Sequence, residues 1–373
     1  MHKQRRGGLR PLSRRQPVLL VALTLLLALV TGCSQPLAGS PPVNAGQFAL
    51  ANVATSLDPN TQGSEAWQQT NGPYAWAYKV DVGSNQGQGR LMMYYVLQDY
   101  NQGEIPPLGV ESDSAFVAKM KQISASYLQA DPSHPIVNSI DLVDPVVDGI
   151  PGPDKLYRHF RSDDEVQHYL NLARSNKMLF FFDTQVGHDT QQSVFNTFLP
   201  YLEQPDVNLA IDPEWDMRPG VIPGYDRGRT TAQTINWLID QMSDLVTLRH
   251  LPPKILVVHV FRPDEQYDST TKPDPSQSWD HIQLKPGVTL IISVDGQGSI
   301  SNKVGNYNFI VDGENGYQFF ADTRTTMASM FLIGFKVYIQ IPCDGNHPNC
   351  EDPYMTPQQV LALKPSPVMV QYQ

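Results

Sequence analysis

Leu179-Phe180-Phe181-Phe182-Asp183 and Ile255-Leu256-Val257-Val258-His259 are the two stretches that decide the fold class. Each is a run of large apolar residues without polar alternation, which is the pattern of a parallel strand covered on both faces. Each run also ends on an ionisable residue. Strands of this kind belong to α/β proteins, so we expect a parallel sheet with helices packed against it.

Similar runs recur from residue 90 onward and alternate with segments of helical periodicity. The predicted strands are 90–98, 137–147, 178–185, 207–214, 255–261, 288–295, 307–312 and 335–341. The predicted helices are 112–129, 162–175, 191–203, 230–249, 299–304, 322–333 and 356–363, with a weaker candidate at 277–284. Eight such units predict an α/β fold of the (β/α)8 TIM-like barrel type, in a single domain. An open doubly wound sheet is the alternative, but no glycine-rich phosphate turn follows any predicted strand.

The first 32 residues have the pattern of a lipoprotein signal peptide. Six basic and no acidic residues occur within the first sixteen, and an apolar run follows over residues 17–30. That run is shorter than the roughly 20 apolar residues of a membrane-spanning helix, which favours cleavage over retention. Val30-Thr31-Gly32-Cys33 resembles the lipobox of bacterial lipoproteins, in which the cysteine is acylated. We therefore expect lipidation at Cys33 and an exported protein anchored to the outer face of the cell membrane; a plain signal peptide is the alternative.

Residues 33–72 are rich in Gly, Pro, Ser, Asn and Gln and carry almost no charge, which predicts a flexible tether. The barrel domain is expected over residues 73–373, with 73–89 adding a strand or strap ahead of the barrel. Without residues 1–32 the formal charge is 21 − 37 = −16, because that segment holds six of the 27 basic residues and none of the 37 acidic ones. This charge argues against nucleic acid as a partner. The last two cysteines, Cys343 and Cys350, predict a disulfide in an oxidising compartment.

Polar or ionisable residues stand at the end of almost every predicted strand. In a (β/α)8 barrel these ends and the loops after them build one face, where functional groups gather. The residues are Gln98 with Asp99, Asp144, Asp183 with Gln185, Asp212 with Glu214, His259, Asp295, Asp312 with Glu314, and Gln340 with Asp344. Because aspartate is a frequent turn residue, chance accounts for Asp99, Asp144, Asp312 and Glu314.

Asp212 and Glu214 form the most informative pair. If both belong to one strand, their side chains point the same way, roughly 6.5 Å apart along the chain. Two neighbouring carboxylates disfavour each other's ionisation, so one keeps a proton while the other stays charged. Glycoside hydrolysis requires this division of labour, with Glu214 as general acid/base and Asp212 or Asp183 as nucleophile or charge stabiliser. An acidic pair that only caps the strand end is the alternative.

Several further residues are predicted to position a substrate. Gln185, His259, Asp295, Trp215 and Lys336 are the candidates, because amide, imidazole, carboxylate and aromatic groups together suit sugar hydroxyls and ring faces. His259 is equally well explained as a core histidine and Asp295 as part of an Asp-Gly turn. Lys336 and Lys303 are also candidates for ion pairs with the acidic cluster; a solvated salt bridge is the alternative that we favour for both. The other aromatic residues near these loops are Tyr225, Trp237, Tyr267 and Trp279, of which Trp237 is expected in a helix core.

A set of short motifs resembles a family of exported bacterial lipoproteins of uncharacterised function, with TIM-like barrels distantly similar in layout to glycoside hydrolases. The motifs are Asp183-x-Gln185-x-Gly187, Ala210-x-Asp212-Pro213-Glu214-Trp215-x-Met217, Val257-Val258-His259-x-Phe261, Asp295-Gly296-x-Gly298, Gly334-Phe335-Lys336 and the tail from Met355-Thr356-Pro357 to Tyr372-Gln373. The resemblance spans roughly residues 148–373. The chain departs from it at Val186, Val260 and the insert around Cys343–Cys350. The resemblance implies the barrel and the location of the site, but no reaction.

These observations favour a hydrolase that acts on envelope or extracellular polysaccharide. A metal-dependent hydrolase with Asp183, Glu214, His259 and Asp295 as ligands is an alternative. No paired-histidine motif supports it, so neither a metal nor a cofactor is expected from the sequence. A non-catalytic barrel that binds a glycan or a partner is a third possibility, because a fold alone does not fix a function.

Overall fold

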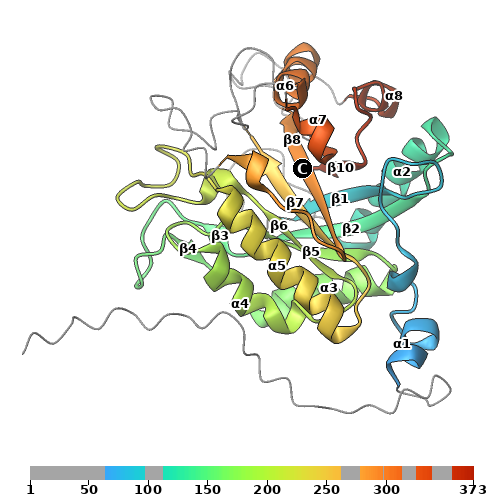
Figure 1. The fold of residues 1–373 in the computed structure, drawn as a ribbon, viewed down its shortest axis with the longest axis horizontal. Coiled ribbons are helices and arrows are strands. Elements are labelled where there is room, and N and C mark those ends of the chain that lie inside the picture. The colour runs from blue at the N-terminus through green and yellow to red at the C-terminus, as the bar shows by residue number, and fades with distance from the viewer. Residues whose placement is uncertain (1–63, 97–111, 262–277, 297, 313–324, 338–354) are drawn as a thin grey trace, which may run out of the picture. The chain divides into compact units, whose positions relative to one another are not determined.

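Eight parallel strands close into a barrel in the computed structural model, which describes residues 64–96, 112–261, 278–296, 298–312, 325–337 and 355–373 (Figure 1). Their order around the barrel is β1 (Arg90–Val96), β10 (Met369–Tyr372), β9 (Leu332–Val337), β8 (Val288–Gly296), β7 (Lys254–Val260), β6 (Val207–Ile211), β5 (Leu179–Thr184) and β2 (Ile136–Val143). The predicted (β/α)8 barrel is therefore confirmed, and the open doubly wound sheet is excluded.

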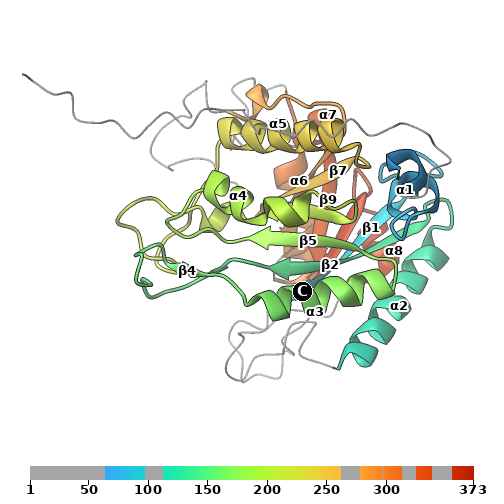
Figure 2. The ribbon, with the colours of Figure 1, turned by 90° about the horizontal axis from the view of Figure 1, so that it is seen from below.

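Helices cover the outside of the strands. They are α2 (Asp113–Ala130), α3 (Asp163–Ser175), α4 (Gln191–Leu202), α5 (Ala232–Arg249), α6 (Ile300–Asp312), α7 (Met327–Met330) and α8 (Pro357–Leu361). Figure 2 shows α4 beside β5 and α3 on the far side of β2. The helix α3 begins at a capping box, in which Ser162 and Glu165 satisfy each other's backbone N–H groups. Short 3-10 turns occur at Ala77–Lys79, Pro213–Trp215 and Trp279–His281.

The prediction of a strand at 307–312 is wrong, because these residues form the last part of α6. The buried residues of this helix, Lys303, Tyr307, Ile310 and Val311, recur every three to four positions, which is the helical period. The β-branched and aromatic residues between 307 and 311 concealed that period. The eighth strand is instead β10, whose four residues were too short a run to stand out.

The predicted helix at 322–333 is also wrong from Phe331 onward. Among its described residues, α7 is a single turn that begins at a Thr326–Ser329 capping box. Phe331 is already extended, and β9 starts at Leu332. The predicted strand 137–147 divides in the same way into β2 and the short hairpin of β3 (Val146–Val147) with β4 (Arg158–His159).

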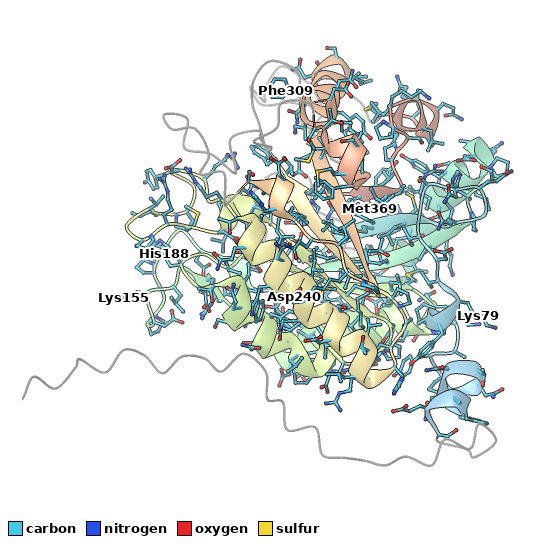
Figure 3. The ribbon with its side chains drawn as sticks, viewed as in Figure 1. Lys79, Lys155, His188, Asp240, Phe309 and Met369 are labelled. Atoms are coloured by element: carbon cyan, nitrogen blue, oxygen red, sulfur yellow. The ribbon has the colours of Figure 1, made fainter. Side chains whose placement is uncertain are left out.

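The barrel lumen is apolar toward one end of the strands and polar toward the other. Toward the amino ends of the strands the lumen is apolar, with Leu91, Leu179, Phe181, Ile255 and Met369 in one cluster. Val82 belongs to this cluster, and Trp76 and Val80 pack against it, so the segment before β1 acts as the predicted strap. Figure 3 shows Met369 among the strands, Lys79 near one end of them, and Lys155 and His188 on neighbouring loops at the other end.

The folded part begins earlier than the sequence suggests. Residues Glu65–Asn71 form α1, which Ser64 caps, within the stretch predicted to be a flexible tether. Gln69 of this helix donates a hydrogen bond to the carbonyl of His250, which ends α5. Cys33, Cys343 and Cys350, and with them the signal peptide, lipidation and disulfide predictions, lie outside the described residues. No helix in the described part of the chain is long and apolar enough to cross a membrane.

Candidate functional site

Polar side chains fill the lumen toward the carboxyl ends of the strands. Side chains alternate along each strand, so every second residue points inward. Seven of the eight strands contribute one such residue to this layer, each 2 % exposed or less: Tyr95, Asp141, Asp183, His259, Asp295, Lys336 and Gln371. The registers that pair Asp295 with Lys336 and Lys336 with Gln371 place these residues side by side on β8, β9 and β10.

His259 lies between two carboxylates. Its Nδ1 is 3.4 Å from Asp295 Oδ1, and its Nε2 is 3.7 Å from Asp183 Oδ2. Burial would lower the pKa of this imidazole, but the negative charges of Asp183 and Asp295 outweigh burial, so its pKa is raised. The lysine of the layer, Lys336, lies 3.5 Å from Asp295 Oδ2 and 4.8 Å from the ring centre of Tyr95. Lys336 is buried, so the solvated salt bridge is wrong for this residue, whereas its ion pair with Asp295 agrees with the other interpretation, a partner of the acidic cluster.

Asp141 and Asp183 are carboxylates in almost complete isolation from water. Burial raises the pKa of Asp141 to about 7, against the opposing effects of Lys336 and a hydrogen bond from Gln371. Burial and the charge of Asp141 raise the pKa of Asp183 well above its ordinary value. Neither oxygen of Asp183 accepts a hydrogen bond within the described residues.

Asp212 follows β6 directly, and its carboxylate is also buried. Gln185 donates to Asp212 Oδ2 at 3.4 Å and to the hydroxyl of Tyr95 at the same distance. Burial raises the pKa of Asp212, although the positive charges of Lys336 and His259 oppose the shift. A carboxylic acid in this position keeps its proton to higher pH than an ordinary aspartate, which is a requirement for a general acid.

Glu214 reaches the site by a route that the sequence did not indicate. The strand β6 ends at Ile211, and Pro213–Trp215 form a 3-10 turn, so strand alternation does not align Glu214 with Asp212. The prediction of a strand through residue 214 is therefore wrong. Pro213, at the first position of the turn, has the fixed φ that starts such a helix. The Glu214 carboxylate forms an ion pair with Arg227.

The connection between β6 and α5 holds this turn in place. Gly228 N–H donates to the carbonyl of Glu214 at 2.6 Å, and Gln191 donates to Asp216 Oδ1 at 2.7 Å. A Cβ atom at Gly228 would lie 2.5 Å from backbone atoms of Asp216, so only glycine allows this approach. Arg227 beside it stacks its guanidinium 3.7 Å from the ring centre of Phe261. The loop thus fixes Glu214 and Trp215 over the barrel mouth.

A pocket of about 390 Å³ opens at this mouth. Its walls combine the carboxylates of Asp212 and Glu214, the Trp215 ring and groups from the barrel layer and the β3–β4 hairpin. The lining residues are Tyr95, Val146, Val147, Asp148, His159, Gln185, Asp212, Glu214, Trp215, Lys336 and Gln373. Asp183, His259 and Asp295 are not among them, because they lie deeper in the lumen and are completely buried.

The remaining predicted residues lie elsewhere. Trp237 packs against Phe195 in the helical layer, as predicted, and Trp279 is buried in a 3-10 turn. Tyr225 is 89 % exposed. Lys303 is buried on α6 and does not line the pocket. Asp144 accepts a hydrogen bond from the Arg161 backbone, which is a structural role. The strand-end positions Gln98, Asp99, Glu314, Gln340 and Asp344 and the aromatic Tyr267 lie outside the described residues.

Sequence reasoning missed Asp141, Tyr95 and Gln371. Asp141 stands inside the apolar run Ile140–Val143, where a lone charged residue was a usable signal. Gln371 was missed together with β10. Although no metal is expected from the sequence, one oxygen each of Asp141 and Asp183 and one nitrogen of His259 lie within 4.8 Å of one another, which is a group that could hold a cation.

The chain matches no model of a known protein family and no curated protein. The barrel that the family resemblance implies is present in the structure, whereas membership of the lipoprotein family stays an expectation.

Proposed function

We propose that this protein is a hydrolase that cleaves glycosidic bonds of a polysaccharide bound in the mouth pocket. The observation that carries the proposal is that Asp212 and Glu214 line the same pocket at the carboxyl ends of the barrel strands. Enzymes with this fold carry their catalytic groups at this end. Glycoside hydrolysis needs one carboxyl group that donates a proton and one that stays charged.

The surroundings of the two carboxyl groups support opposite roles for them. Arg227 places a positive charge against Glu214, which favours its ionised form. Within the described residues Asp212 forms no ion pair with an arginine, and burial raises its pKa. We therefore assign the proton donor to Asp212 and the charged carboxylate to Glu214, the reverse of the assignment that the sequence favours. Asp183, the third catalytic candidate, is a buried residue behind the pocket lining.

The other pocket groups suit a sugar. Trp215 provides a flat apolar ring for the apolar face of a pyranose. Gln185 and the hydroxyl of Tyr95 already bond to each other beside Asp212, and Lys336 adds a donor at the pocket floor. Hydroxyl groups of a substrate can bond to these groups, which would fix its orientation relative to Asp212.

A glycan-hydrolysis screen tests the proposal. Wild-type protein is compared with Glu214→Gln, Asp212→Asn and the surface control Asp154→Asn, a carboxylate that pairs with Arg158 and does not line the pocket. We expect wild type and Asp154→Asn to hydrolyse at least one envelope polysaccharide, and both pocket variants to lose a factor of about 100 or more. Equal activity in all four proteins would remove the pair from the mechanism. Glycan binding without hydrolysis by wild type would favour a binding barrel.

We further propose that the protein works outside the cell membrane, with a lipid on Cys33 as its anchor. The signal peptide pattern and the lipobox-like Val30-Thr31-Gly32-Cys33 support this location. Cys33→Ala should leave the protein unlipidated and release it from the membrane fraction, whereas mass spectrometry should find an acyl chain on wild-type protein from that fraction. A wild-type protein whose Cys33 carries no acyl chain would contradict the anchor.

A further inference from the structure

We infer that Asp141, Asp183 and His259 bind a divalent transition-metal cation inside the barrel lumen. The three residues come from β2, β5 and β7 and are completely buried behind the lining of the mouth pocket. The proposed hydrolysis by Asp212 and Glu214 does not require this cation. The two proposals can therefore fail separately.

The spacing of the three donor atoms fits a cation. One oxygen of each aspartate and one nitrogen of His259 lie within 4.8 Å of one another, so all three lie within about 2.8 Å of a common point. Bonds from Zn²⁺ to imidazole nitrogen and carboxylate oxygen are about 2.0–2.2 Å long. Side-chain shifts of less than about 1 Å would bring every donor to that distance, and no strand has to move.

Neighbouring groups orient the donors toward that point. Asp295 Oδ1 lies 3.4 Å from His259 Nδ1, which favours a proton on Nδ1 and leaves the Nε2 lone pair directed at Asp183. Metal-binding histidines usually direct their second nitrogen at a carboxylate or carbonyl in this way. Gln371 donates to Asp141 Oδ2, and Asp141 Oδ1 is left without a hydrogen bond within the described residues.

The unmet bonding capacity of the group is the second observation that points to a ligand. Both oxygens of Asp183 and Nε2 of His259 make no hydrogen bond within the described residues, although both side chains are 0 % exposed. Buried polar atoms without partners are costly and rare in folded proteins. A neutral Nε2 and a carboxylate oxygen 3.7 Å apart also repel each other unless a positive charge lies between them.

The charge balance of the lumen agrees with a cation. Asp141, Asp183, Asp212 and Asp295 are buried in the layer together with Lys336, which lies 3.5 Å from Asp295. One lysine does not balance four carboxylates, and a divalent ion at Asp141 and Asp183 would supply the two further positive charges next to these two residues. Buried carboxylates are ordinarily paired with cations or coordinate metals.

The donor set selects the kind of cation. Two carboxylate oxygens and one imidazole nitrogen suit Zn²⁺ or Mn²⁺, whereas Ca²⁺ and Mg²⁺ favour ligand sets made of oxygen alone. Three protein ligands leave at least one coordination position for water or another group. The alternative occupant of the space between His259 and Asp183 is a single proton.

Metal titration of purified protein separates these two occupants. Protein dialysed against a chelator is titrated calorimetrically with ZnCl₂ and with MnCl₂, and bound metal is measured by mass spectrometry after dialysis. The variants are Asp183→Asn and His259→Gln. The matched controls are Asp113→Asn and His168→Gln, which change an exposed aspartate–histidine pair on α2 and α3. We expect wild type and controls to bind about one Zn²⁺ or Mn²⁺ per chain, and each site variant to bind at least tenfold more weakly.

A second measurement covers the case in which a buried variant does not fold. Co²⁺ titration of wild type should give the visible absorption of a cobalt ion bound by oxygen and nitrogen ligands. Circular dichroism of each variant tells lost folding from lost binding. The inference is overturned if wild type binds none of the three cations, which is the result expected for a proton. It is also overturned if folded Asp183→Asn and His259→Gln proteins bind metal as tightly as the controls.

Discussion

His259 Nε2 faces Asp183 Oδ2 across the barrel lumen at 3.7 Å, although β6 lies between the two strands that carry them. The residue of β6 that pairs with Asp183 is Ala210, a member of the lumen cluster. We attribute the approach of His259 and Asp183 to the small side chain of Ala210, which occupies the lumen position on β6. Larger residues at this position would fill more of the lumen.

We predict that Ala210→Leu separates His259 from Asp183. Because the lumen is tightly packed, the added carbon atoms should lower the free energy of unfolding by about 1–3 kcal/mol. Chemical denaturation measures this loss, and the metal titration described above should show weaker binding by the same variant. Ala173→Leu, a buried alanine on α3 in the outer core, is the control for overpacking alone. Unchanged metal affinity in Ala210→Leu would contradict the prediction.

Trp215 and Tyr225 belong to the same connection between β6 and α5, but only Trp215 lines the pocket. We predict that Trp215→Ala raises the KM for a hydrolysed glycan about tenfold, equivalent to about 1.4 kcal/mol of binding, with a smaller change in kcat. Tyr225→Ala should leave both constants unchanged, because this side chain is 89 % exposed. Steady-state kinetics of the two variants measure the difference. A KM for Trp215→Ala that is as close to the wild-type value as that of Tyr225→Ala would show that Trp215 does not contact substrate.

The barrel was predictable because its strands are buried on both faces, which makes runs such as Leu179–Phe182 conspicuous. The run at 307–312 was misread because periodicity over six residues does not separate a strand from the buried face of a helix. The strand β10 has four residues, and only its register with β1 and β9 identifies it as a strand.

Site residues were predictable from the sequence where an ionisable side chain stands at the end of a predicted strand. The strand-end pattern points to His259 and Asp295, whereas Lys336 stands near the start of the predicted strand 335–341. The structure brings all three into one layer. Asp141 lies inside β2, so a pattern of polar residues at strand ends does not include it. The stagger of strands in a closed barrel lifts its carboxylate to the level of Asp183, and this depends on registers that no single segment of sequence encodes.

The buried side chain of Lys254 makes the free energy of unfolding depend on pH. It is completely buried at the amino end of β7, where it donates to the carbonyls of Gln204 and Val207. Burial lowers its pKa to about 7, although Asp206 opposes the shift. Between pH 7 and about 10.5 the unfolded chain holds a proton that the folded chain lacks, so stability rises with pH in that range. The gain is on the order of 5 kcal/mol at most.

We predict that Lys254→Met removes this rise. The variant should be less stable than wild type at pH 10, because it leaves the carbonyls without their donor, at a cost of about 1–3 kcal/mol. Its free energy of unfolding should change less between pH 7 and 10 than that of wild type. Urea denaturation at several pH values measures both curves. If the free energies of unfolding of wild type and Lys254→Met change equally with pH, Lys254 keeps an ordinary pKa in the folded protein.

Asp212 sets the expected pH dependence of the proposed reaction. As the proton donor it acts only while protonated, so kcat/KM falls as pH rises through its pKa, which burial raises above the ordinary value of an aspartate. Glu214 acts only while ionised, so the rate also falls on the acid side, and the profile is bell-shaped.

Asp212→Asn should lose most of the activity, and its residual rate should lack the alkaline limb. Glycosides with a good leaving group need less protonation by an acid. For these substrates the rate of Asp212→Asn should fall less, relative to wild type, than for a natural glycan. An alkaline limb that persists in Asp212→Asn would assign the proton donor to another group, and Glu214→Gln would then be the next variant to profile.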